Sequence, residues 1–512
     1  MLSSPTNTGA LLSIGNLLRA IIAFCSLACL ISFSFFEQGY AYLFTIAAYN
    51  LFLHPLRKYP GPRLWAASRI PYSHAYLSGQ MHKKILALHK EYGPIVRIAP
   101  DELSYNHPDA WKHLHGHLKN GTGDHGRDPV FTRDNKHSLI GAGREDHARF
   151  RRALSRGFSA QSMHEQEPII KQYVDLLFQR LDAVAGSGPV NMVAWYNWTT
   201  FDIIGDLVFG EPFGCLAESK YHPWVKILFE GIKANAYKMN IQRYPLIQGL
   251  LMRFMPAELK TKREQHFELT REKVGKRLSM ETHRPDFMDS MTRKTGDQAL
   301  RMEELYANSA ALILAGSETT ATALSATTYY LVTHGGALDK LQKEVRSAFS
   351  SEDEIDILST QKLEYAQAVV NEGLRMFPPV PTGFMRRVME GDGVFLGQHV
   401  PRDTLVQAWH WPIYHNPAYF ALPNDFVPER WLGDVRFAND CREAFQPFSV
   451  GPKGCIGKNL AYAEMRLILA RMVWTFDMRI ADESRGWDER GRVYLAWEKG
   501  PLNVYLSPRK LE

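Results

Sequence analysis

One cysteine stands in a setting that suits chemistry: residues 448–457 read FSVGPKGCIG, and a helical apolar pattern follows at once. Cys455 therefore precedes a helix N-terminus, where free backbone N–H groups and the helix dipole stabilise a thiolate. Glycines such as Gly451 and Gly457 let the backbone adopt positive φ and pass close under a flat cofactor, and Phe448 offers an aromatic face. A lone cysteine is most often a buried structural residue, but this spacing favours a ligand. We predict that Cys455 is the axial thiolate of a haem iron, a ligand that favours O–O cleavage.

A second group of reactive side chains interrupts the most apolar stretch of the chain, residues 305–333. Residues 315–320 read AGSETT, and Gly, Ser and Thr in mid-helix loosen the hydrogen-bond ladder. A local opening would make room for dioxygen and water. Splitting O2 needs protons, for which Thr319 can hydrogen-bond the distal oxygen and Glu318 can relay protons from solvent. The alternative is a notch of small residues for helix packing, beside a solvated Glu318.

The two segments together resemble a known family. The spacing F-x-x-G-x-x-x-C-x-G resembles the haem-binding signature of the cytochrome P450 family, and residues 315–320 match that family's A/G-G-x-D/E-T-T motif without departure. One position departs, because Lys453 stands two residues before the cysteine, where the family usually has Arg or His to contact a haem propionate. Lysine can pair with a carboxylate, but as a point charge rather than a bidentate fork. The resemblance covers about residues 50–508 and implies haem b as the cofactor.

Acidic and basic residues earlier in the chain extend the resemblance. Glu372 and Arg375 lie three apart on one helix face, and residues 426–431 read FVPERW, so Arg430 precedes a tryptophan where the family usually has Phe. Pairs of this spacing are common and usually solvated. Their order before the cysteine loop resembles the family's E-x-x-R and P-E-R-F elements. The resemblance implies that Glu372, Arg375 and Arg430 form a buried ionic network that supports the haem loop.

Haem propionates need basic donors from outside the cysteine loop. His147 and Arg151 lie one helical turn apart, and the family often has Trp or His at the first of these positions and Arg at the second. Arg386 matches a third contact of the family, although Arg387 is an alternative. A surface cation is the competing interpretation for each of these residues.

Composition sets the class of protein. The chain has 512 residues, of which 45% are hydrophobic and 12% aromatic, so a large core is available and a disordered protein is excluded. A net charge of +6 without any Lys/Arg-rich run gives no indication of nucleic-acid binding. The five cysteines show no paired spacing, which argues against a disulfide framework or zinc site and favours a reducing compartment. Asn197 begins a formal glycosylation sequon, which stays unmodified in the cytosol.

The N-terminal region predicts a membrane anchor. Residues 20–36 carry no charged side chain and as a helix would be about 26 Å long, enough for a thin bilayer. A cleaved signal peptide is the alternative, but the basic n-region is missing and apolar character resumes over residues 40–53. The pattern leaves open one span or a tight hairpin within residues 20–53. The basic flank, with Arg57 and Lys58, places the rest of the chain in the cytosol.

The remaining pattern predicts one large, mainly α-helical domain with small β-sheets. Helical apolar spacing occurs around residues 143–158, 165–185, 193–210, 301–334, 360–376 and 456–476. Strand-like pieces occur near residues 95–98, 394–400 and 502–506. We therefore divide the chain into a membrane anchor, a stiff Pro/Gly linker and a haem-thiolate catalytic domain, at residues 1–55, 56–64 and 65–512.

The resemblance implies a monooxygenase that hydroxylates, epoxidises or further oxidises a lipophilic small molecule. Residues 54–62 (HPLRKYPGP) look like membrane-anchored filamentous-fungal members of secondary metabolism, which implies terpenoid or polyketide substrates. It further implies an endoplasmic-reticulum membrane and electrons from NADPH through NADPH–cytochrome P450 reductase, with cytochrome b5 as a further candidate partner. Basic residues predicted to form the reductase docking face are Arg149, Arg152, Arg156, Lys453 and Lys458.

Two other functions remain open at this point. A haem-thiolate isomerase or dehydratase rearranges a peroxide without a reductase, and it needs no proton relay for O2. A non-catalytic haem sensor or electron carrier needs neither that relay nor a roomy apolar pocket. The pair Glu318 and Thr319 therefore favours the monooxygenase over both alternatives.

Overall fold

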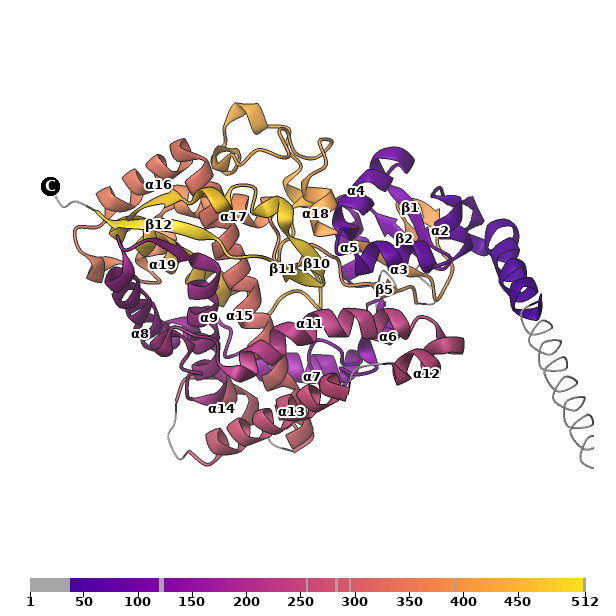
Figure 1. Ribbon diagram of the computed structural model, residues 1–512, viewed down its shortest axis with the longest axis horizontal. Coiled ribbons are helices and arrows are strands. Elements are labelled where there is room, and N and C mark those ends of the chain that lie inside the picture. Colours follow the sequence, from indigo (N-terminus) through magenta and orange to yellow (C-terminus); the bar gives the residue numbers. More distant parts are fainter. Residues whose placement is uncertain are drawn as a thin grey trace, which may run out of the picture.

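The computed structural model describes residues 37–118, 124–254, 257–280, 284–293, 296–389 and 393–509. A large helical body carries small sheets at its edges, and the helix of residues 37–48 extends away from it at one end (Figure 1). That helix continues into the π-helical turn η1 (Tyr49–Leu53) and the 3-10 turn η2 (Pro55–Lys58).

The central element of the body is α15 (Met302–Thr333), whose residues are buried along most of its length because nearly every face is apolar or small. The helices before it are α2 (Arg63–Ala67), α3 (Ile70–Leu77), α4 (Met81–Tyr92), α5 (Ala110–His115), α6 (Pro129–Thr132), α7 (Arg144–Leu154), α8 (Ala160–Val184), α9 (Met192–Phe209), α10 (Cys215–Glu218), α11 (Pro223–Ile241), α12 (Pro245–Arg253), α13 (Ala257–Leu278) and α14 (Phe287–Thr292). Those after it are α16 (Gly335–Ala348), α17 (Glu364–Met376), α18 (His410–Tyr414) and α19 (Lys458–Thr475). The central helix packs against α9, α13, α17 and α19, so it connects the two sides of the body.

The largest sheet lies beside α4 and has the order β1-β2-β8-β5-β3, with β2 and β8 parallel and its other neighbours antiparallel. All residues of β1 are buried, as expected for a strand covered on both faces. The strands of this sheet are β1 (Ile95–Ala99), β2 (Glu102–Tyr105), β3 (Gly126–Arg127), β5 (Arg386–Arg387) and β8 (Leu405–Ala408).

Smaller sheets hold the C-terminal part of the chain. One has the order β4-β12-β9, and two hairpins are formed by β6 with β7 and by β10 with β11. Their bounds are β4 (Pro189–Asn191), β6 (Val394–Phe395), β7 (Gln398–His399), β9 (Phe476–Ile480), β10 (Arg492–Tyr494), β11 (Ala496–Glu498) and β12 (Asn503–Pro508). The remaining 3-10 turns are η3 (Gly296–Gln298), η4 (Glu352–Glu354), η5 (Ser359–Lys362), η6 (Pro428–Leu432), η7 (Val435–Phe437), η8 (Arg442–Ala444), η9 (Asp482–Ser484) and η10 (Asp488–Arg490).

The expected helices and strands are present, with one difference in kind. The segment 394–400, expected as a strand-like piece, is a hairpin of β6 and β7. Leu396 and Gly397 have φ of 48° and 76°, the pair of positive values that a tight two-residue turn requires. The β-branched and aromatic residues Val394, Phe395 and Val400, which flank the turn, therefore gave one strand pattern across it.

The predicted membrane anchor at residues 20–36 lies outside the described residues. Within the part of the chain that is described, no helix is both long and apolar enough to span a bilayer. The helix of residues 37–48 and η1 nevertheless leave large apolar side chains exposed, among them Phe44 and Leu53.

The segment 56–64, expected as a linker, is also part of the folded body. Leu56 and Tyr59 are buried in the core beside the five-stranded sheet. A Cβ at Gly61 would lie 2.3 Å from the Arg97 carbonyl oxygen, so only glycine allows this close approach to β1.

A buried carboxyl connects the central helix to the helix after the cysteine loop. Glu464 of α19 hydrogen-bonds Thr320 of α15, and burial raises its pKa from 4.5 to about 8. The folded state therefore favours the protonated carboxyl, and its contribution to stability falls as pH rises from about 4.5 to about 8.

Between about pH 6 and pH 9 ionisation of Glu464 should lower the free energy of unfolding of the wild type by an amount on the order of 2 kcal/mol. Glu464→Gln, a neutral mimic of the protonated form, should not show this loss. Unfolding midpoints measured across that range for wild type and variant provide the test. Parallel pH curves for the two proteins would contradict a protonated Glu464.

Candidate active site

The cysteine loop closes on itself just before α19. The Cys455 amide donates a hydrogen bond to the Phe448 carbonyl oxygen at 2.8 Å, and Gly451 has φ of 75°. A Cβ at Gly451 would lie 2.0 Å from the His115 carbonyl oxygen, so the loop packs directly on the backbone after α5. Gly457, by contrast, has φ of −84°, which corrects the prediction that each glycine supplies a positive φ.

Gly457 has a different use in the structure. A Cβ there would stand 3.9 Å from Cys455 Sγ and 3.8 Å from Phe158, on the side of the sulfur itself. Glycine therefore keeps the approach to the thiol clear, as a flat cofactor lying against the sulfur requires.

The helix dipole alone does not determine the pKa of the Cys455 thiol. Burial of the sulfur raises the pKa of Cys455, although the Gly457 amide, Arg151 and Lys458 each act to lower it. Desolvation by the atoms packed around the sulfur outweighs the helix N-terminus, although the Cys455 side chain as a whole is exposed. A metal cation bound to the sulfur reverses this balance and deprotonates the thiol.

Buried cations gather beside the loop. Arg386 is buried, and its Nε and Nη2 donate to His115 Nδ1 at 3.1 and 3.0 Å. Arg386 Nη1 and Arg127 Nε have no hydrogen-bond partner among the described residues. Desolvation lowers the pKa of Arg386 to about 10 and that of Arg127 to about 9. Arg387 instead is 40% exposed near Asp403, so Arg386 is the arginine that belongs to the cluster.

Buried guanidinium nitrogens without a hydrogen-bond partner, here Arg386 Nη1 and Arg127 Nε, call for an anion. The cluster beside Cys455 fits the two carboxylates of a haem, which Arg386, Arg127 and His147 would hold. Arg127 and His115 were missed in the sequence, since no motif marks them.

Two of the expected propionate donors have protein partners. The Lys453 ammonium pairs with Asp124, and both side chains are buried. Arg151 Nη1 donates to the Gly454 carbonyl oxygen at 2.7 Å and so supports the cysteine loop. His147 is buried, and burial followed by the nearby cations lowers its pKa to about 4, which leaves a neutral imidazole. Lys453 is thus less available to a propionate than predicted, because Asp124 already neutralises it.

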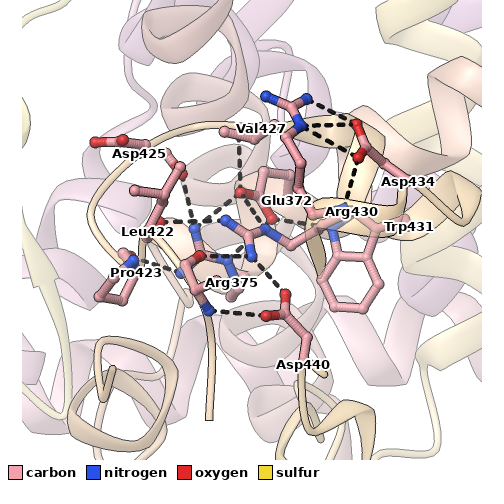
Figure 2. A network of polar contacts seen from close by, with 12 residues as sticks. Glu372, Arg375, Leu422, Pro423, Asp425, Val427, Arg430, Trp431, Asp434 and Asp440 are labelled. Atoms are coloured by element: carbon pink, nitrogen blue, oxygen red, sulfur yellow. Dashed lines mark hydrogen bonds and ion pairs between the residues drawn. The ribbon is translucent and has the colours of Figure 1, made fainter. Parts of the chain in front are cut away.

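The predicted ionic network is formed as one buried unit (Figure 2). Arg375 Nη2 and Nε donate to the two Glu372 oxygens at 2.8 and 2.9 Å, and Arg430 Nε donates to Oε1 at 3.0 Å. Burial alone would raise the pKa of Glu372, but Arg375 and Arg430 outweigh it and hold that pKa below its ordinary value. The acid is therefore an ionised centre between two cations.

Two further members were not recognised in the sequence. The Trp431 indole Nε1 donates to Glu372 Oε2 at 2.9 Å, so the change from the usual Phe adds a hydrogen bond to the acid. Asp440 lies 2.5 Å from Arg430 Nη1, also buried. Arg375 in turn donates to the Pro423 carbonyl oxygen at 2.7 Å, which ties the network to the segment before the cysteine loop. Two acids and two arginines make the unit electrically neutral.

The central helix runs without interruption through residues 315–320, which corrects the expected local opening. Thr319 Oγ1 donates to the Ala315 carbonyl oxygen at 2.7 Å, within its own helix. A Cβ at Gly316 would lie 2.7 Å from Ile204 Cδ1, so this glycine serves the close packing of α9 on α15. The packing alternative is therefore right for Gly316.

Glu318 is buried instead of solvated, and the Lys499 ammonium pairs with its Oε1. Thr322 Oγ1 donates to the same oxygen at 3.2 Å. The two expected relay residues thus have separate partners in this structure.

Comparisons with known proteins agree with this site. The profile of the family described as Cytochrome P450 matches residues 59–504. The trichothecene C-15 hydroxylase of Fusarium sporotrichioides is 52% identical over 476 residues, covering 92% of this chain and 97% of the relative. Cytochrome P450 monooxygenase astJ of Aspergillus oryzae is 43% identical, covering 90% and 94%, and averantin hydroxylase of Dothistroma septosporum is 42% identical, covering 91% and 90%.

The chain belongs to the cytochrome P450 family. It is a haem-thiolate monooxygenase similar to enzymes of filamentous-fungal secondary metabolism, and the reductase-independent alternative is not favoured. Membership implies a haem cofactor and electrons supplied by a reductase, and the residues around Cys455 fit that cofactor.

Proposed function

We propose that this monooxygenase oxygenates a trichothecene or a terpenoid of similar size. The observation that carries the proposal is the 52% identity to a trichothecene C-15 hydroxylase over nearly the whole of both chains. Haem b would supply the activation of O2, with electrons from NADPH through NADPH–cytochrome P450 reductase and with cytochrome b5 as a further donor.

A cavity of about 950 Å³ supports a lipophilic substrate. Its walls come mainly from α11 and the β10–β11 hairpin, and apolar side chains such as Phe229 and Leu251 dominate them. Glu318 lies in the same wall, so the cavity reaches the central helix.

The proposed roles of the residues follow from their positions. Cys455 would ligate the iron, while Arg386, His147 and Arg127 would hold the propionates. Thr319 would hydrogen-bond the distal oxygen of O2, and Glu318 would move protons from the cavity side of the central helix. The network of Glu372 keeps the cysteine loop in place.

We further propose an anchor in the endoplasmic-reticulum membrane with the catalytic domain in the cytosol. The exposed apolar side chains of residues 40–53 and the basic residues that follow them support this placement. Separation of fungal membranes from cytosol, with carbonate washing, tests it.

The substrate proposal is tested with membranes that contain the protein and a fungal reductase. A trichothecene lacking one hydroxyl is offered with NADPH under ¹⁸O2, and we expect a product that carries one ¹⁸O atom. Omission of NADPH or reductase is the control. Product formation without NADPH would favour the isomerase. The substrate class would be overturned if no trichothecene gave a product and a deletion strain showed changed polyketides but unchanged terpenoids.

The proposed reductase surface needs two corrections. Lys453 leaves it, because its buried side chain pairs with Asp124. Arg149 Nη2 pairs with Asp146 and with the buried Glu304, each at 2.7 Å, so this arginine holds α7 to α15. Arg152, Arg156 and Lys458 remain exposed.

We expect Arg152→Glu with Lys458→Glu to slow reductase-driven turnover about tenfold at low salt, because like charges oppose docking. The reduced CO spectrum should stay normal. A matched double reversal of Arg253 and Arg271, exposed on α12 and α13, is the control. Equal turnover in both double variants would place the docking surface elsewhere.

A further inference from the structure

The proposed relay residue Glu318 forms a buried ion pair with Lys499, and the lysine has no role in the site as described so far. Glu318 is 3% exposed and the Lys499 side chain 5% exposed, although Lys499 lies 181 residues further along the chain. Glu318 Oε1 accepts from Lys499 Nζ and from Thr322 Oγ1, while Oε2 has no hydrogen-bond partner among the described residues.

The pair lies in the wall of the 950 Å³ cavity. Other charged or titratable side chains of that wall are Tyr221, Lys226, Glu230, Lys233, Tyr237, Tyr494 and Glu498. Lys233 is engaged with Glu498 at 2.7 Å on the exposed side of the cavity. Among these groups, Lys499 is the cation that contacts Glu318.

Lys499 is held in place from both sides. On one side, Trp497 stacks on Phe377 with ring centroids 3.9 Å apart, and its indole donates to the Pro378 carbonyl oxygen at 2.7 Å. On the other, the Leu502 amide donates to Asn191 Oδ1 at 3.2 Å. The short segment between these anchors therefore presents the ammonium to α15 from a fixed position.

A buried carboxylate without a countercharge takes up a proton, because desolvation favours the neutral form. Lys499 supplies that countercharge and also fixes the direction of the carboxylate. Thr319, the next residue, meanwhile bonds the Ala315 carbonyl oxygen, so a relay requires Glu318 to exchange its lysine contact for a contact toward Thr319.

We propose that Lys499 is the positioning residue of the proton relay: it holds the Glu318 carboxylate between the cavity and Thr319 and releases it when a proton is passed. This rests on the proposed monooxygenase chemistry, in which O2 reduction consumes protons. In this role Lys499 acts through the Glu318 carboxylate that it contacts. A purely structural ion pair would affect stability alone.

The experiment is a double-mutant cycle with Lys499→Met, Glu318→Gln and the double variant. We expect the rate of NADPH-dependent O2 reduction to fall about tenfold in Lys499→Met, below the roughly 100-fold that a positioned proton donor contributes. The ratio of rates in H2O and D2O should rise in Lys499→Met. In the Glu318→Gln background, the same lysine substitution should change neither quantity, because the group it positions is gone.

Two controls separate a relay role from other effects. Lys233→Met removes a cation from the same cavity without contact to Glu318, and it should leave the isotope ratio unchanged. Lys499→Arg, which keeps the charge, should restore most of the wild-type rate. Reduced CO spectra show whether each variant is folded. Unfolding midpoints of Lys499→Met, Glu318→Gln and the double variant measure the energetic coupling between Lys499 and Glu318 without any turnover.

The outcomes are decisive in each case. Coupling in the unfolding midpoints with an unchanged isotope ratio would make the pair structural and overturn the proposal. Absence of coupling in both measurements would overturn it as well. The O2-reduction assay contains no trichothecene, so it is independent of the proposed substrate. If no trichothecene is oxidised but the isotope ratio still changes in Lys499→Met, the substrate class is wrong and the relay proposal stands. If the reductase proves to be the wrong electron donor, the same isotope ratios can be measured with a chemical reductant, so the relay is tested independently of the donor.

Discussion

Cys455→Ser should give a protein whose reduced, CO-treated form lacks the thiolate-type Soret band and which has no measurable monooxygenase turnover. The serine hydroxyl does not ionise at neutral pH, and oxygen donates less electron density to iron than sulfur does. The loop itself should persist, since its closing hydrogen bond joins the backbone of Cys455 and Phe448. Difference spectra and NADPH-dependent product formation measure the effect.

Cys441→Ser is the matched control, because this cysteine is half-buried and lies outside the loop. It should retain the normal band and turnover. A thiolate-type band in Cys455→Ser, or loss of that band in Cys441→Ser, would contradict the assignment of Cys455 as the iron ligand.

Glu372→Ala should leave little haem-bound protein. The substitution removes the buried acceptor of two arginines, of the Trp431 indole and of the Val427 amide. Breaking a buried pair by removing one partner costs about 3–5 kcal/mol, because a charge remains without compensation. The cysteine loop depends on this unit, so haem content per protein and the unfolding midpoint should fall together.

Asp482→Ala provides the comparison. Asp482 and Arg485 have the same three-residue spacing as Glu372 and Arg375, but both are exposed, and the pair is worth about 1 kcal/mol or less. Haem content should be normal in this variant. Normal haem content in Glu372→Ala as well would contradict the supporting role of the network.

Local patterns in the sequence predicted most of the scaffold and the centre of the site. Periodic apolar residues marked α7, α8, α9, α15 and α19 to within a few residues, and the cysteine loop and Glu372 carried their own motifs. Such features depend on neighbours along the chain, which the sequence displays directly.

Pairs between distant segments were not predictable in this way. Lys453 with Asp124 and Glu318 with Lys499 are separated by 329 and 181 residues, and only tertiary packing brings them together. The same limit explains Arg149, whose surface-like position on α7 faces a buried acid of α15.

The neutral unit of Glu372, Arg375, Arg430 and Asp440 also restricts how this chain can evolve. Its two positive and two negative groups are buried together, so replacing any one of them by a neutral residue strands a charge. A new arrangement becomes accessible only when an acid and an arginine change together. Drift by single substitutions is therefore blocked at this position, while the walls of the cavity remain free to diversify toward other substrates.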